Sequence, residues 1–158
     1  MVRTPLTDDD WRALGFDAMR VGATSLETGP AEMVLGDPAP GDAPVHRNTA
    51  TKVDHAVLRV PSLDRAVAEL GLEERRRGGP RDVPMSFLRA GEAVIELVET
   101  GADTVFWGVA FRVASIEAAV AAAGGRIGAP TRAVQGGWIA AALDASFPVA
   151  VLERGPTA

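Results

Sequence analysis

The sequence predicts an α+β fold of two βαβββ modules, preceded by an N-terminal αββ element. The main observation is an internal repeat: DHAVLRVPSLDRAVAELG, starting at Asp54, is matched by WGVAFRVASIEAAVAAAG, starting at Trp107. A unit of about fifty residues buries too little apolar surface to be stable alone, so the two copies are expected to pack together. We therefore divide the chain into an N-terminal segment, residues 1–50, and one domain, residues 51–158, with modules at about 51–101 and 104–155.

The first module begins with a predicted strand over residues 52–60, where side chains alternate and are often β-branched. Ser62 is a typical helix N-cap, and apolar residues at helical spacing predict a helix over residues 63–70 that ends at Gly71. Turn-rich segments then separate three more predicted strands, over residues 72–77, 85–90 and 93–99.

The second module repeats this order of elements. Residues 105–113 form its predicted first strand, and Ser115 is the predicted N-cap of a helix over residues 116–123 that ends at two glycines. Three strands are expected to follow, near residues 125–127, 138–143 and 148–153.

The first fifty residues lie outside the repeat. Thr7, followed by three aspartates, predicts the capped start of a short helix. Residues 19–27 and 31–35 are predicted to form a hairpin, and the proline-rich residues 36–48 are predicted to be a linker or a surface strap.

Composition limits the classes of function. A net charge of -5 and a pI near 5.0 argue against nucleic acid as a partner, since phosphate binding requires a surplus of Lys and Arg. The absence of Cys excludes disulfides, thiolate nucleophiles and Cys-ligated zinc. No apolar run is long enough for a membrane span or a signal peptide, so a cytoplasmic protein with a small-molecule ligand is expected.

The segments DHAVLRVPSLDRAVAEL, FLRAGEAVIELVE and FWGVAFRVASIEAAV resemble the vicinal oxygen chelate superfamily, which includes glyoxalases, bleomycin-resistance proteins and dioxygenases. The resemblance covers roughly residues 51–154. It implies that the strands of both modules curve into one mixed-sheet cup around a small-molecule site, and it favours a homodimer. In metal-using members, residues on the first and last strands of each module bind a divalent ion.

Carried over by position, His55 and Glu96 match the metal ligands of the first module. In the second module, Gly108 stands in place of the histidine, and an apolar residue among 149–151 stands in place of the carboxylate. A divalent cation needs three or more protein donors, so the sequence predicts no metal site and no cofactor. His55 and Glu96 are instead the candidate catalytic acid–base pair, with a structural hydrogen bond between them as the alternative.

Three other residues are candidates for additional metal ligands, namely His46 on the linker, Glu99 and Glu153. Strand alternation turns Glu99 to the face opposite Glu96. His46 lies on a segment expected to be flexible, so its reach is not set by the sequence.

The same alternation predicts which side chains face the cup. If His55 points inward, then so do Val57 and Arg59, and Phe106 and Arg112 do so in the second module. These four residues, together with Trp138 as wall of the cup or as core, are the candidate substrate-binding residues.

Each of the two equivalent arginines has two interpretations. They either recognise an anionic ligand or form salt bridges with Asp54, Asp64 or Glu117. Trp107 and Phe111 are expected to face the helices as part of the core.

Three functions are compatible with these features. The first is a metal-free, glyoxalase-like protein that binds a small, partly apolar or anionic molecule, with acid–base chemistry by His55 and Glu96. The second is a metal-dependent lyase, isomerase or dioxygenase whose ligands are completed by another segment or subunit. The third is a non-catalytic sensor or interaction module whose cup is filled by side chains.

Overall fold

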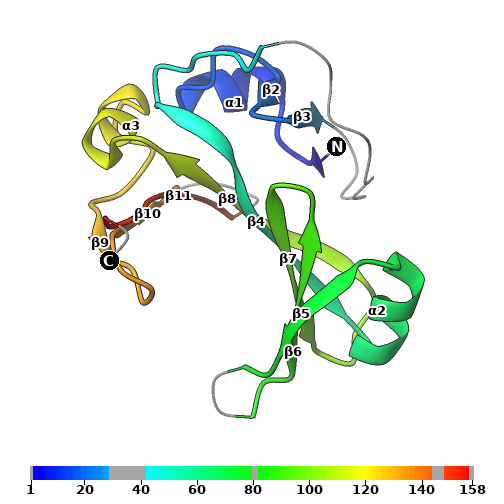
Figure 1. The fold of residues 1–158 in the computed structure, drawn as a ribbon. Coiled ribbons are helices and arrows are strands. Elements are labelled where there is room, and N and C mark those ends of the chain that lie inside the picture. The colour runs from blue at the N-terminus through cyan, green and yellow to red at the C-terminus, as the bar shows by residue number, and fades with distance from the viewer. Residues whose placement is uncertain (1, 29–41, 80–81, 144–147, 157–158) are drawn as a thin grey trace.

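The computed structural model describes residues 2–28, 42–79, 82–143 and 148–156 (Figure 1). The first module starts with β4 (Ala50–Val60), which leads into α2 (Leu63–Leu70). Ser62 is the N-cap of α2, and Gly71 ends the helix at φ 61°, as predicted. The module is completed by β5 (Glu73–Arg77), β6 (Met85–Ala90) and β7 (Ala93–Glu99).

The second module consists of β8 (Val105–Val113), α3 (Ile116–Ala122), β9 (Thr131–Arg132), β10 (Trp138–Ala141) and β11 (Val149–Glu153). The strand expected near residues 125–127 does not form, and Ile127 makes only an isolated bridge with Ala142. The reason is that Gly124 and Gly125 both have positive φ, which continues the turn after α3. The outer strand of this module is therefore β9.

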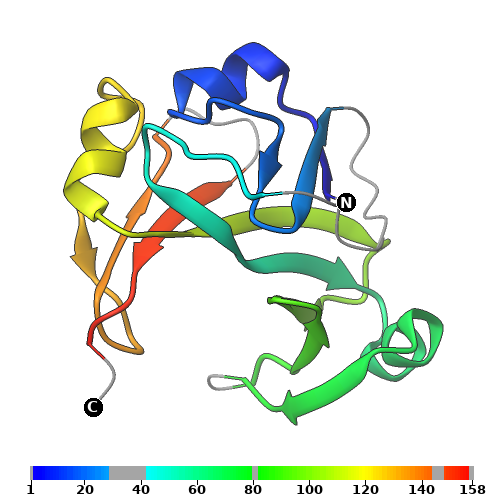
Figure 2. The ribbon, with the colours of Figure 1, turned by 45° about the horizontal axis from the view of Figure 1, so that its top comes forward.

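All eight strands of the two modules form one mixed sheet in the order β5-β6-β7-β4-β8-β11-β10-β9. β4 and β8 pair antiparallel at the centre, and each has the last strand of its own module as a parallel neighbour. The sheet curves, so the outer strands of the modules lie on two separate arms (Figure 2). The α+β fold class, with two βαβββ modules in one curved sheet, is confirmed.

The N-terminal segment contains β1 (Val2–Thr4), α1 (Asp8–Ala13), β2 (Arg20–Val21) and β3 (Thr24–Thr28). Thr7 caps α1 as predicted and shares a capping box with Asp10. The single strand expected over residues 19–27 is wrong, because Gly22 at φ 59° turns the chain between β2 and β3. The second predicted strand, residues 31–35, lies outside the described residues.

The last residues of the predicted linker are anchored in the core. Asn48 is fully buried, donates from Nδ2 to the carbonyl of Leu14 (3.1 Å) and accepts from the backbone N–H of Ala50 (3.0 Å). His46 is buried as well. Residues 46–48 are therefore a fixed connection, contrary to the expectation of a flexible linker, whereas residues 36–41 lie outside the described part.

The N-terminal segment packs on the same face of the sheet as the helices. The rings of Trp11 and Phe16 lie 5.6 Å and 4.7 Å from the ring of Phe111, and all three side chains are buried. We call the opposite face of the eight-stranded sheet, which α2, α3 and the N-terminal segment do not cover, the open face (Figure 1). Within the described ranges no helix has the length and apolarity needed to cross a membrane.

The pairing of β4 with β8 has three register shifts, and the two nearer the middle of the strands change which side chains reach the open face. Val53 pairs with Phe111 and His55 pairs with Ala110, so Asp54 is an extra residue on β4. A bulge of this kind turns two neighbouring side chains to one face, and Asp54 and His55 accordingly both lie on the open side.

At the second of these two shifts, Leu58 pairs with Phe106 and Val57 pairs with Gly108, so Trp107 is an extra residue on β8. Phe106 therefore joins Leu58 in the covered core, where it is 3% exposed, and Trp107 is 40% exposed. Strict alternation of side chains along β8 fails at this bulge. Phe106, which was expected in the cup, is therefore part of the core, and Trp107, which was expected in the core, is exposed.

Candidate functional site

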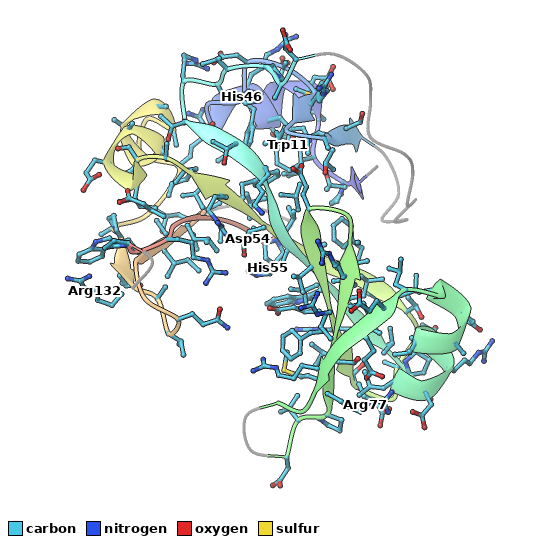
Figure 3. All side chains as sticks on the ribbon, in the orientation of Figure 1. Trp11, His46, Asp54, His55, Arg77 and Arg132 are labelled. Atoms are coloured by element: carbon cyan, nitrogen blue, oxygen red, sulfur yellow. The ribbon has the colours of Figure 1, made fainter. Side chains whose placement is uncertain are left out.

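Asp54 is the centre of a polar cluster on the open face (Figure 3). Its side chain is 6% exposed. Arg112 donates to Oδ1 from Nε (3.0 Å) and from Nη2, and Arg154 donates from Nη2 to Oδ2 (3.3 Å). His55 completes the cluster through its Nδ1, which lies 3.0 Å from Oδ2. Of the salt bridges expected for Arg112, the one with Asp54 forms.

Asp54 stays ionised in this environment. Burial by itself raises the pKa of a carboxyl group. The hydrogen bonds from His55 and Arg112, together with the charges of Arg154 and Arg112, outweigh burial and hold the pKa of Asp54 well below its usual range.

The ionised carboxylate determines the tautomer of His55. A carboxylate has no hydrogen to donate, so Nδ1 of His55 must carry the hydrogen of the bond to Asp54. In the neutral ring, Nε2 then keeps its lone pair, and it has no hydrogen-bond partner among the described residues. His55 is partly exposed, which leaves Nε2 as the available proton acceptor on the open face.

His46, the other histidine, has no free nitrogen. It is 3% exposed; its Nδ1 accepts from the backbone N–H of Asp17 (3.0 Å), and its Nε2 donates to the carbonyl of Arg20 (2.8 Å). Its ring also lies edge-on to Phe16, with centroids 5.5 Å apart. His46 therefore attaches the N-terminal segment to the core and is not a metal ligand.

Glu96 shares the open face with His55. On β7 it pairs with Val57 of β4 and with Phe87 of β6, and it is half-buried. No hydrogen bond or ion pair joins Glu96 to another described residue. The hydrogen-bond partner of His55 is thus Asp54 and not Glu96. The sequence named Asp54 only as a salt-bridge partner of the arginines and not as the partner of His55. Plain alternation turns Asp54 away from His55, and the bulge brings the two together.

Arg59 lies on the open face two residues after Val57. Its guanidinium carbon is 4.6 Å from the ring centroid of Trp107, a cation–π geometry. Trp107 was not among the candidate site residues, although it flanks the open face beside Gly108. Arg59 makes no ion pair with a described carboxylate, in contrast to Arg112.

Trp138 lies on the covered face. It pairs with Glu153 and alternates with Ala140, which is buried and pairs with the buried Val151. The guanidinium of Arg132 lies 4.0 Å from its ring centroid. The structure thus separates Trp138 from His55 and brings Val57, Arg59 and Arg112 to the same face as His55.

The metal positions expected from the fold can be located by strand register. In the first module, Glu96 pairs with the residue two places after His55. In the second module, Ala150 pairs with Ala110, the residue two places after Gly108. Ala150 is therefore the equivalent of Glu96. A side chain at Gly108 would also crowd β11, because its Cβ would lie 3.1 Å from the carbonyl oxygen of Pro148.

The remaining acidic candidates are occupied elsewhere. The carboxylates of Glu99 and Glu153 accept hydrogen bonds from the backbone N–H groups of Leu63 and Ile116, at 2.8 Å and 2.7 Å. No cluster of three or more His, Cys, Asp or Glu side chains suited to a metal is found in the described parts of the chain. The first module offers two donors, His55 and Glu96, whereas the matching positions of the second module are Gly108 and Ala150, which have no donor atom in the side chain. This set of residues does not fit a divalent ion.

A pocket of about 320 Å³ lies elsewhere, between the first turn of α2, the ends of β5 and β7 and the start of β6. Its arginine, Arg77, is already paired with Asp64 and Glu74. The pocket contains neither His55 nor any other member of the Asp54 cluster.

The two βαβββ modules in one curved sheet give the chain a glyoxalase-like fold. The structure is similar to methylmalonyl-CoA epimerase from Mycobacterium tuberculosis, with a TM-score of 0.54 and 18% sequence identity over 68% of this chain and 91% of that chain. It is also similar to a hypothetical protein from Bacillus halodurans C-125, with a TM-score of 0.53 and 21% identity over 68% of this chain and 96% of that chain.

A longer match is found with a mutant of 4-hydroxymandelate synthase from Streptomyces coelicolor. Its TM-score is 0.50 with 14% identity, and it covers 93% of this chain and 66% of that chain, so it extends into the N-terminal segment. No family model matches the sequence, and no curated protein matches it either. At these identities the similarities establish the fold and leave the activity to be argued from the site.

Proposed function

We propose that this protein is a metal-free, glyoxalase-like protein that binds a small, partly apolar or anionic molecule on the open face and moves a proton through His55. The observation that carries the proposal is the bond between Asp54 and His55. A carboxylate on Nδ1 keeps Nε2 free as a base and stabilises the imidazolium that forms once the proton is taken. Asp54 is a positioning residue in this scheme, and His55 is the catalytic base.

Glu96 is the proposed partner for returning the proton. It stands on the strand next to His55, on the same face, and no described side chain holds it. Val57 lies between them on β4 and, with Trp107, supplies apolar surface for the ligand. Arg59 supplies a cation beside that surface.

The alternative functions have less support. The metal-dependent alternative requires donors that the second module lacks, since Gly108 and Ala150 occupy the relevant positions. The non-catalytic alternative required Phe106, Val57 and Trp138 to fill the cup. Of these three, only Val57 lies on the open face, whereas Phe106 and Trp138 belong to the covered face.

The test is hydrogen exchange at carbon. The protein is incubated in D₂O with a panel of small keto acids and 1,3-dicarbonyl compounds, and deuterium incorporation is followed by NMR. We expect faster exchange of at least one compound with the wild type than with His55→Gln, and no effect of EDTA. Exchange that is equal in both proteins for every compound would remove His55 as the base. Exchange that EDTA abolishes, with near one equivalent of bound metal in elemental mass spectrometry, would favour the metal-dependent alternative.

The proposal includes the assembly and compartment expected from the sequence, a cytoplasmic homodimer. Half-exposed apolar side chains on the open face, among them Val105 and Trp107, are the kind of surface that a second copy covers. Light scattering on the purified protein tests this, because a monomer mass at all concentrations is incompatible with a dimer.

A further inference from the structure

We infer that Arg112 and Arg154 form a subsite for an oxyanion, the carboxylate or phosphate group of the small ligand, beside the free nitrogen of His55. This inference deepens the proposed function and rests on it for the identity of the site as a ligand site. It names the substrate class, namely small molecules that carry an oxyanion next to the carbon or oxygen that gives up its proton.

The charges of the Asp54 cluster do not balance. Two guanidinium groups meet a single described carboxylate, Asp54, so one positive charge remains without a partner in the described part of the cluster. Glu96 is another acid on the open face, and it makes no ion pair with either arginine. A positive charge in a partly buried position attracts an anion more strongly than one in open solvent.

Both arginines also keep hydrogen-bond donors that their contacts with described residues do not use. A guanidinium group has five N–H donors in a planar fork. Arg112 uses Nε and Nη2 for Asp54, which leaves Nη1 free among the described contacts. Arg154 uses Nη2 for Asp54 and Nη1 for Gln135 (2.9 Å), which leaves Nε free. Both side chains are reachable from solvent, with 31% and 36% of their surface exposed.

The free donors of the two arginines lie beside His55. Both arginines and His55 bond to the same carboxylate, so a group bound by the free N–H donors lies next to the imidazole. The register places Ala110 directly beside His55 and Ala150 beside Ala110, so the neighbouring side chains on β8 and β11 are methyl groups. A ligand anchored by its oxyanion therefore presents its adjacent atoms to Nε2 of His55.

The experiment is an NMR titration of the full chain with acetate and, separately, with inorganic phosphate, at constant ionic strength maintained with chloride. Acetamide serves as the neutral counterpart of acetate. The signals followed are the imidazole of His55 and the Nε–H groups of the arginines, with buried His46 as internal reference. We expect saturable shifts with acetate or phosphate, whichever oxyanion fits, and no saturable shift with chloride or acetamide.

The variant Arg154→Gln should weaken the oxyanion affinity at least tenfold. Arg132→Gln is the matched control, because Arg132 stacks on Trp138 on the covered face and should leave the affinity unchanged. Arg154→Lys is the variant to use if Arg154→Gln lowers the melting temperature so far that binding is unmeasurable. It keeps a positive charge near Asp54 but loses the forked N–H donors, so we expect a smaller loss of oxyanion affinity than for Arg154→Gln. Unchanged affinity in the Arg154 variants, or equal shifts with chloride, overturns the subsite.

The two proposals fail separately. His55→Gln should abolish hydrogen exchange at carbon but keep the shift of the arginine Nε–H signals on adding the oxyanion. Oxyanion binding without His55-dependent exchange would leave the subsite standing and remove the proton-transfer function. Exchange that depends on His55 but not on Arg112 or Arg154 would remove only the subsite.

Discussion

Glu99 and Glu153 occupy equivalent places in the two modules and make the same contact. Glu99 lies three residues after Glu96 on β7, and Glu153 lies three residues after Ala150, the matching position on β11. Each carboxylate accepts a hydrogen bond from the first backbone N–H of the helix in its own module, at 2.8 Å and 2.7 Å. A carboxylate at a helix N-terminus satisfies an otherwise unpaired N–H and interacts favourably with the helix dipole. The repeat has therefore kept a structural contact in both halves, while the donors at the ligand positions are present in one half only.

Removal of either carboxylate should destabilise the protein. We expect Glu99→Ala and Glu153→Ala each to lower the free energy of unfolding by about 1–2 kcal/mol, because a helix-terminal N–H loses its partner. Urea denaturation measures this. Glu69→Ala is the control, since Glu69 pairs with Arg65 in an exposed position and should change stability by less than about 0.5 kcal/mol. Equal effects of all three variants would mean that the contacts do not act as caps.

Asp54 should make stability depend on pH in the acid range. Its pKa is lower in the folded state, so the unfolded state takes up the proton first as pH falls, beginning near pH 4, where an ordinary Asp titrates. The stabilisation is thus complete above that pH and declines toward the folded pKa. Asp54→Asn should cost about 3 kcal/mol at neutral pH, because two arginines lose their carboxylate.

Urea denaturation at pH 7 and pH 3 tests this prediction. The difference in unfolding free energy between the two pH values should be smaller for Asp54→Asn than for the wild type. The same difference in both proteins would show that other carboxyl groups cause the acid sensitivity.

The two histidines should differ in chemical reactivity. Diethyl pyrocarbonate acylates the lone pair of a neutral imidazole nitrogen, and only His55 has such a nitrogen free. Mass spectrometry of the folded protein near pH 7 should therefore find modification at His55 and not at His46, and none in His55→Gln. His55→Gln should also unfold at nearly the wild-type temperature. Rapid modification of His46 in the native protein would contradict its buried, doubly bonded position.

The sequence predicted the modules because a repeat reports on packing units, and the caps at Ser62 and Ser115 are local signals. It did not predict Asp54 or Trp107 as residues of the open face. Each belongs to a bulge in the pairing of β4 with β8, and a bulge depends on the register between two strands far apart in the chain. The sequence also left open which of residues 149–151 corresponds to Glu96 in the second module. The register of β11 with β8 identifies this residue as Ala150.

The N-terminal segment should be part of the folding unit and not an appendage. Trp11 is fully buried against Phe16 and Phe111, the latter on the central strand β8. Trp11→Ala should lower the free energy of unfolding by about 3–5 kcal/mol, because it leaves a large cavity on the covered face of the sheet. Trp11→Phe is the matched control, since it keeps an aromatic ring and removes an indole N–H that has no partner among the described residues. It should cost less than about 1.5 kcal/mol. Both variants should unfold in one transition, and a separate early transition for the N-terminal segment would show that it folds independently of the two modules.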